Sequence, residues 1–116
     1  MNDRELLELA AKAAGLSGWV YEPAINGMLL PPYISHEGAF KPLTDDGDAL
    51  RLAVVCQLGI SIVGGRAGLV DCVSFKDCHG FVSSREIADD GDLMEATRRA
   101  ITRCAAEYQL RKEKQK

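Results

Sequence analysis

Two copies of an Asp-Asp-Gly-Asp motif, at 45–48 and at 89–92, are the most conspicuous groups of residues that could do chemistry. Clustered carboxylates can hold Mg²⁺ or Ca²⁺. Each copy, however, precedes an apolar stretch with a helical period. There, acidic side chains cap the first N–H groups and oppose the helix dipole. Capping therefore explains the motif, and the spacing lacks the alternating ligands and distal glutamate of an EF-hand loop.

Cysteine and histidine form a second group with metal-binding chemistry. Residue types that zinc accepts occur at Cys72, Cys78, His79, His36 and Cys104. Their spacing matches no standard zinc motif, so we expect no metal or other cofactor. Cys78 and His79 are also poorly suited as nucleophile and base, because adjacent residues on a strand or turn point apart. We expect all four cysteines to be reduced, with Cys56 and Cys104 buried and Cys78 the most reactive.

A glycine-rich loop at 64–68, Gly-Gly-Arg-Ala-Gly, forms a third group. Backbone N–H groups and Arg66 could cradle an anion, which makes Gly65 and Arg66 candidate phosphate-binding residues. The loop leads into a predicted strand, so no helix dipole assists, and it lacks the Gly-Lys-Ser/Thr ending of a Walker loop. A plain hairpin loop is the competing interpretation.

The segment 19–40 concentrates aromatic residues and proline. It holds four of the seven aromatic residues of the chain, and all four prolines lie in it or close to it. Aromatic residues commonly anchor interfaces, and loops stiffened by proline lose less entropy on binding. We therefore predict that a ligand, a partner or a second copy of the chain contacts this segment. The candidate binding residues are Trp19, Tyr21, Tyr33 and Phe40. For each of them, packing beneath the loop is the alternative.

Hydrophobic periodicity and turn signals predict the elements that position these residues. A first helix is expected over 2–14, capped by Asn2 and ended by Gly15, and a hairpin is expected around Asn26-Gly27. A second helix from the first acidic motif to about Leu58, a three-strand meander, and a last helix over 92–110 follow. The strands are expected at 60–63, 69–75 and 81–84.

This order, α-β-β-α-β-β-β-α, predicts an α+β fold with an antiparallel sheet, arranged as a three-layer α-β-α sandwich. Both faces of the strands are apolar, which favours helices on both sides of the sheet, with the second helix as its most buried partner. A two-layer arrangement with all helices on one face is the alternative.

Length and charge limit the classes of function. The 116 residues suffice for one domain, expected over 1–110, followed by a frayed basic tail at 111–116. No apolar run approaches the ~20 residues of a membrane span, and the acidic start lacks a signal peptide, so we expect a cytoplasmic protein. The net charge of −3 argues against nucleic acid as a partner. Residues 98–116 carry a net +5, which is expected to be a solvated helix face.

Three blocks of sequence resemble a family of small tailed-phage and prophage proteins. They are DRELLELAAKAAG at 3–15, PLTDDGDALRLAV at 42–54 and ATRRAI at 96–101. On these blocks the chain resembles the phage α-β-α sandwich domain family, whereas segment 28–36 departs from the family pattern. The resemblance implies a sheet with helices on both faces and a phage origin. The family as a whole has no established activity, so no mechanism follows from the resemblance.

No catalytic motif in the chain is strong, and two classes of function remain. The first is a non-catalytic phage accessory protein that acts in the host cytoplasm by binding a host protein or a small ligand, with a host defence system as the expected target and a homo-oligomer as a further option. The second is a nucleotide- or phosphate-binding protein, or a small enzyme, that uses the 64–68 loop.

Overall fold

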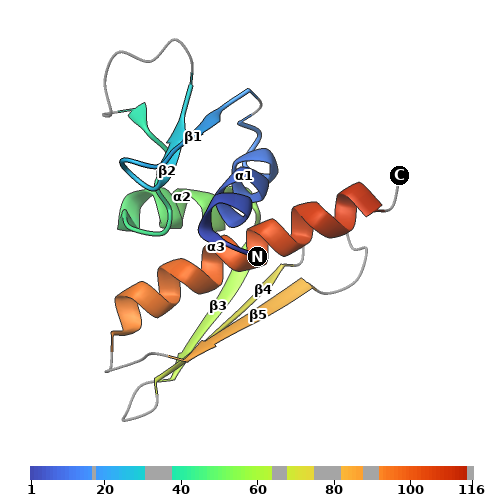
Figure 1. Ribbon diagram of the computed structural model, residues 1–116. Coiled ribbons are helices and arrows are strands. Elements are labelled where there is room, and N and C mark those ends of the chain that lie inside the picture. The colour runs from blue at the N-terminus through green and yellow to red at the C-terminus, as the bar shows by residue number, and fades with distance from the viewer. Residues whose placement is uncertain (17, 31–37, 64–67, 75–81, 88–91, 115–116) are drawn as a thin grey trace.

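The computed structural model describes residues 1–16, 18–30, 38–63, 68–74, 82–87 and 92–114. These residues form three helices and five strands in the expected order, and the α+β class is confirmed (Figure 1). The elements are α1 (Asp3–Ala13), β1 (Val20–Glu22), β2 (Gly27–Leu29), α2 (Asp46–Val55), β3 (Leu58–Val63), β4 (Leu69–Ser74), β5 (Val82–Ile87) and α3 (Leu93–Lys114).

The local signals at the first helix and the hairpin act as predicted. The Asn2 side chain accepts a hydrogen bond from the Glu5 amide at 2.8 Å and caps α1. Gly15, with φ of +81°, takes the left-handed conformation that ends the helix. Strands β1 and β2 pair antiparallel, and Asn26, at φ of +47°, makes the turn between them.

The second sheet is an antiparallel meander in the order β3-β4-β5. In its register Ile60 lies opposite Cys72, and Ile62 lies opposite Val70. Along β4, buried and partly buried side chains alternate, and Val70, Cys72 and Ser74 form the buried set. One face of the sheet therefore belongs to the core.

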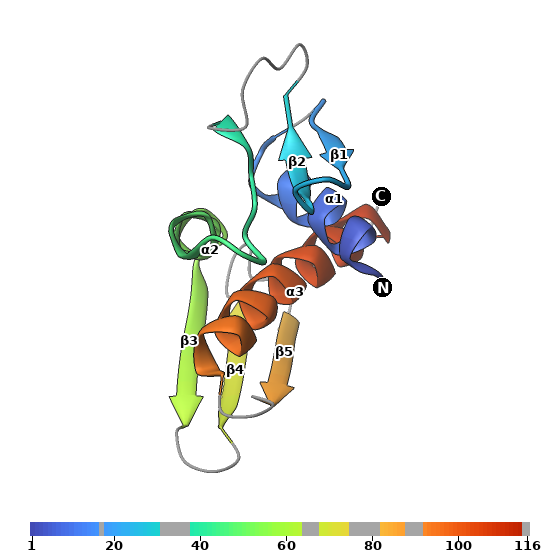
Figure 2. The same ribbon diagram turned by 60° about the vertical axis from the view of Figure 1, so that its left-hand side comes forward.

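Helix α3 crosses that face, and the other elements lie on the far side of α3 (Figures 1 and 2). The main core lies around α3, between the sheet on one side and α1, the β1-β2 hairpin and α2 on the other. The expectation that helices cover both faces of the sheet is corrected in this respect. Figures 1 and 2 show the three helices on one side of the three-stranded sheet, so the described residues place no helix on its second face.

Helix α2 is more exposed than its apolar sequence predicts. It was expected to reach Leu58 and to be the most buried partner of the sheet. It ends at Val55 because Gln57 adopts φ of +55°, and Leu58 already begins β3. Leu50 and Val54 remain 63% and 69% exposed. The helix packs mainly on α3 and has a smaller contact with β3 of the sheet.

The last helix runs to Lys114, about one turn beyond the expected end near residue 110. Most of the side chains that α3 buries are small. These small side chains include Ala96, Ala100, Cys104, Ala105 and Ala106. Small side chains let neighbouring elements approach the helix closely on both sides. No helix in the described part of the chain is long and apolar enough to cross a membrane.

Candidate functional site

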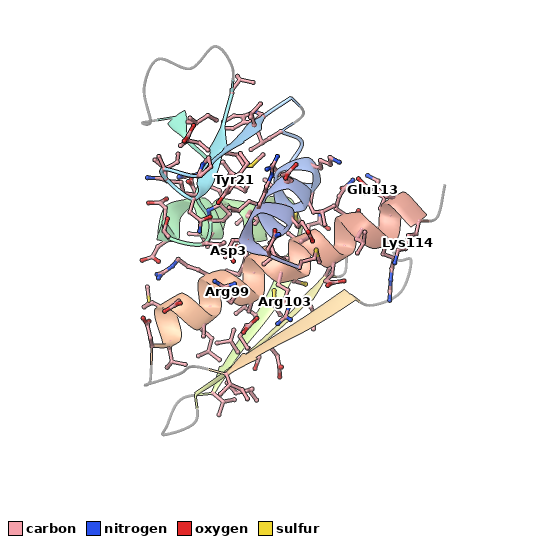
Figure 3. The ribbon with its side chains drawn as sticks, viewed as in Figure 1. Asp3, Tyr21, Arg99, Arg103, Glu113 and Lys114 are labelled. Atoms are coloured by element: carbon pink, nitrogen blue, oxygen red, sulfur yellow. The ribbon has the colours of Figure 1, made fainter. Side chains whose placement is uncertain are left out.

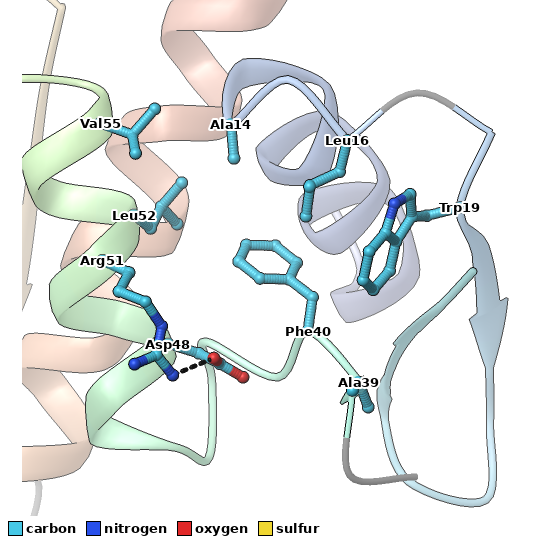
Figure 4. A pocket seen from close by; sticks show the side chains of 10 residues that line it. Ala14, Leu16, Trp19, Ala39, Phe40, Asp48, Arg51, Leu52 and Val55 are labelled. Carbon is cyan, nitrogen blue, oxygen red and sulfur yellow. Dashed lines mark hydrogen bonds and ion pairs between the residues drawn. The ribbon is translucent and has the colours of Figure 1, made fainter. Parts of the chain in front are cut away.

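A cleft of about 240 Å³ lies between the end of α1, residues 38–40 and α2 (Figure 4). Two of the four aromatic residues predicted to bind a partner, Trp19 and Phe40, line it together. Apolar side chains supply most of its wall, and an ion pair stands at one end. The lining residues are Ala14, Leu16, Trp19, Gly38, Ala39, Phe40, Asp48, Arg51, Leu52 and Val55.

Local backbone geometry brings Trp19 and Leu16 to the cleft. After α1 ends at Gly15, the Leu16 amide donates to the Ala11 carbonyl at 2.8 Å and turns the chain back on the helix. Gly18 also has a positive φ, of +83°, and directly precedes Trp19. Both side chains are partly buried against the core, so each leaves part of its surface in the cleft.

Phe40 is fixed by backbone hydrogen bonds to the hairpin. Its amide donates to the Met28 carbonyl, and the Met28 amide donates to the Phe40 carbonyl, each at 2.9 Å. Gly27 permits this approach, because a Cβ at that position would lie 2.9 Å from the Phe40 carbonyl oxygen and 2.6 Å from Cγ of Lys41. The ring thus occupies a defined place in the cleft.

Asp48 ties α2 to the segment that carries Phe40. Its Oδ2 accepts from the Lys41 amide at 2.8 Å, and its Oδ1 accepts from Nη2 of Arg51 at 2.7 Å (Figure 4). The Asp48 side chain is 12% exposed, whereas the Arg51 side chain is 70% exposed. The hydrogen bond and the charge of Asp48 raise the pKa of Arg51 above its ordinary value. A permanently charged guanidinium therefore stands at the polar end of an apolar cleft.

The chemistry of this lining suits binding. Both Asp48 oxygens already accept hydrogen bonds, and Arg51 stays protonated. Among the described lining residues there is no cysteine, serine, threonine, histidine, lysine or tyrosine to act as a nucleophile or a proton carrier. The cleft can enclose an apolar group and offer N–H donors to an acceptor beside it.

A second hollow, of about 330 Å³, lies on another side of Trp19 and Leu16. Its lining includes the charged side chains of Glu8 and Lys12, and Gln109 from α3. It lacks the apolar enclosure that the first cleft provides. We therefore regard the cleft beside Arg51 as the candidate site, although the second hollow is larger.

The other predicted binding residues are not brought to the cleft. The Tyr21 hydroxyl donates to Oδ1 of Asn26 at 2.8 Å, and the Arg4 guanidinium lies 5.8 Å from the ring centre. Tyr21 thus packs between the hairpin and α1, in agreement with internal packing. Tyr33, Gly65 and Arg66 lie outside the described residues.

The acidic motifs act as helix caps where the structure describes them. The Asp45 side chain accepts from the Asp48 amide at 2.8 Å, and the Asp92 side chain accepts from the Glu95 amide at 3.0 Å. Asp46 instead forms an ion pair with Arg98 at 2.7 Å. Within the described ranges, no three acidic, cysteine or histidine side chains form a group that could hold a metal ion. Residues 89–91 lie outside those ranges.

The arginines of α3 connect it to other elements. Arg99 contacts Asp3 of α1 at 3.2 Å, and Arg103 contacts Glu86 of β5 at 2.6 Å (Figure 3). Arg98 donates from Nε to the Leu43 carbonyl at 3.0 Å, in addition to its ion pair with Asp46. These side chains were expected to form a solvated helix face. They form ion pairs between elements instead.

Among the described residues, the thiols of Cys56, Cys72 and Cys104 are buried, as was expected for Cys56 and Cys104. Cys72 lies beside Cys104, whose Sγ donates to the Cys72 carbonyl at 3.5 Å. A hydrogen bond between the two side chains, followed by burial, raises the pKa of the Cys72 thiol. The remaining residues considered as zinc ligands or as a nucleophile and base lie outside the described residues. They are His36, Cys78 and His79.

Sequence reasoning found the two aromatic residues of the cleft and missed its other wall. Asp48 was assigned to capping, and Arg51, Leu52 and Val55 were assigned to a buried helix. A usable signal was present, because a carboxylate and an arginine three residues apart on a helix form a local pair. No protein-family model, curated protein or solved structure matches the chain.

Proposed function

We propose that this protein is a non-catalytic binding module that encloses one apolar side chain of a partner protein in the cleft beside Arg51. The observation that carries the proposal is the convergence of Trp19 and Phe40, which are 21 positions apart in the sequence, on one cleft with a guanidinium at its end. Aromatic residues and arginine are enriched in the contacts that anchor interfaces.

The size of the cleft favours a single side chain over a larger ligand. Its volume of about 240 Å³ is below the ~300–1,000 Å³ that is usual for small-molecule sites. A cavity of ~150 Å³ already accepts a benzene molecule. One leucine, phenylalanine or tryptophan side chain, presented by a folded or extended partner, suits the available space.

Arg51 adds a preference for charge. Asp48 holds the guanidinium in place and leaves the side chain largely exposed. A planar guanidinium with several N–H donors binds carboxylates well, often through two hydrogen bonds. The preferred partner group is therefore an apolar side chain next to a carboxylate, such as an acidic residue or a chain terminus.

The biological setting of this binding is proposed from the phage resemblance. A small binding module fits a phage accessory protein that acts in an infected host cell, where a host defence protein would be its target. The alternative is phosphate binding by the 64–68 loop. It stays a prediction, because residues 64–67 lie outside the described ranges.

Fluorescence of Trp19, the only tryptophan of the chain, provides the test. N-acetylphenylalanine should change its emission on titration, and N-acetylphenylalaninamide, which lacks the carboxylate, should bind at least about threefold more weakly. Val55→Phe should fill the cleft and abolish the response. Val20→Phe is the matched control, because Val20 is similarly exposed but does not line the cleft.

The same pair of variants tests whether a partner protein binds at the cleft. A host protein that is co-purified from infected cells with the wild type and with Val20→Phe should be lost with Val55→Phe. A partner retained equally by both variants would contradict the proposed site. A melting shift with nucleotides, and none with the phenylalanine probes, would favour the phosphate-binding alternative.

A further inference from the structure

Exposed apolar side chains gather where α2, α3 and β3 meet. On α2, Leu50 and Val54 follow Asp46 by four and eight residues, so all three share one side of the helix. On α3, Met94 precedes Arg98 by four residues and shares its side. Arg98 forms an ion pair with Asp46 at 2.7 Å, so these two helix sides adjoin at that pair. All three apolar side chains remain exposed.

Strand β3 continues this surface. Ile60 and Ile62 lie opposite Cys72 and Val70, and therefore on the face of the sheet that α3 covers. Nevertheless both isoleucines are exposed, because α3 packs mainly on β4 and β5 and leaves β3 outside it (Figure 2). We call this set the α2-β3 surface, and its members are Leu50, Val54, Ile60, Ile62 and Met94.

The outer edge of β3 has no protection of the usual kind. In the described part of the chain, β3 pairs with β4 along one edge and with no strand along the other. Its residues, 58–63, include no charge and no proline, whereas β5, at the opposite edge of the sheet, carries Arg85 and Glu86. Edge strands usually carry charges or proline, or are covered. A six-residue uncharged apolar strand is otherwise a site of aggregation.

We infer that β3 pairs with β3 of a second copy of this chain. The two strands run antiparallel about a two-fold axis at Ser61, and the two meanders become one six-stranded sheet. Ile60 of each copy then lies opposite the other copy's Ile62, on the same face as both α3 helices. Because α2 lies near the Leu58 end of β3, its Leu50 and Val54 come beside the second copy's Ile62.

The composition of the surface identifies a second copy as the occupant. A two-fold axis places each residue opposite itself or its symmetry mate, and this strand offers no like charges to repel. The five side chains of the α2-β3 surface present on the order of 500 Å² per copy, against ~800 Å² for each partner of a standard interface. Pairing of the strand backbones supplies much of the difference.

Sedimentation of two matched variants tests the inference. Ile62 and Ile87 are 53% and 65% exposed, and they lie on opposite edge strands. The wild type should sediment as a dimer. Ile62→Lys should raise the dimer Kd at least about tenfold with an unchanged circular dichroism spectrum, whereas Ile87→Lys should not. A monomeric wild type, or equal effects of the two substitutions, would overturn the inference.

Cross-linking tests the register of the two β3 strands without introducing a charge at the interface. Ser61→Cys should form a covalent dimer under mild oxidation, because the axis places the two introduced thiols opposite each other. Val20→Cys, at an exposed position of the other sheet, should not. Equal cross-linking of the two variants would overturn the inference. None of these substitutions touches the cleft, so failure here leaves the proposed function standing.

Discussion

Asp48 and Arg51 are joined by a 2.7 Å hydrogen bond across the first turn of α2, and one side chain is nearly buried while the other is largely exposed. The asymmetry gives the two residues different roles. Asp48 also accepts from the Lys41 amide and so holds the segment of Phe40 against α2. Arg51 faces solvent at the end of the cleft and can meet a partner.

Asp48→Ala should therefore destabilise the fold far more than Arg51→Ala. Loss of Asp48 leaves the Lys41 amide without its acceptor and should cost about 2–3 kcal/mol, the usual range for a part-buried hydrogen bond to a charged group. Arg51→Ala removes an exposed ion pair, which contributes little to folding, and should therefore lower the free energy of unfolding much less. Urea denaturation measures both, and equal losses would contradict the roles assigned here.

Gly27 and Gly38 form a pair that tests how Phe40 is held. A Cβ at Gly27 would meet backbone and side-chain atoms of residues 40 and 41, whereas a Cβ at Gly38 has no atom within 4 Å. Gly27→Ala should cost about 1–3 kcal/mol through overpacking, and Gly38→Ala should be close to neutral. Thermal melting gives the comparison, and a neutral Gly27→Ala would show that residues 40–41 are not fixed by this approach.

The acidic motifs should contribute as caps and not as metal ligands. Asp45→Ala and Asp92→Ala each remove a side chain that accepts from a first-turn amide, and each should cost about 1 kcal/mol. Neither Mg²⁺ nor EDTA should move the melting temperature of the wild type. A large shift with either reagent would instead indicate a metal site.

The buried cysteines should resist alkylation in the folded protein. The thiolate is the reactive form, and the raised pKa keeps Cys72 protonated, so a change from neutral to mildly alkaline pH should not speed its labelling. Cys56 and Cys104 should be protected by burial, and Cys78 should be labelled first. Mass spectrometry after brief exposure to an alkylating reagent gives the order in which the cysteines are labelled. Early labelling of Cys72 in the absence of denaturant would contradict this account.

The features that sequence reasoning predicted well depend on neighbouring residues. Asn2 and Asp45 cap helices through bonds to residues three positions away, and Gly15 ends a helix by its own backbone conformation. The alternation along β4 likewise follows from the two-residue period of a strand. Such signals need no knowledge of the tertiary arrangement.

The arrangement of the layers depends on side-chain size as well as on hydrophobicity. The predicted place of α2 in that arrangement was wrong. The apolar α2 was expected against the sheet, but the central position belongs to α3. The buried alanines of α3, such as Ala100 and Ala105, allow close packing on two sides. The larger side chains Leu50 and Val54 stay at the surface instead. Hydrophobicity alone does not distinguish these two outcomes.

The arginines illustrate a second limit. They were expected on a solvated helix face, yet Arg99 and Arg103 form ion pairs with Asp3 and Glu86 on other elements. Long side chains can reach several charged partners, and only the tertiary structure determines which of these partners lie near. The cleft has the same origin, because its two aromatic residues and its arginine come from three separate segments.

Chemical-shift mapping by NMR with N-acetylphenylalanine tests the cleft most directly. The Trp19 indole N–H and the backbone amides of Phe40 and Arg51 should shift together on titration, while the amide of Ile87, on the far edge strand, should not. Val55→Phe should remove these shifts, and Val20→Phe should retain them. Shifts confined to other surfaces, or none at Trp19 and Phe40 at saturating probe, would contradict the claim that this cleft is the binding site.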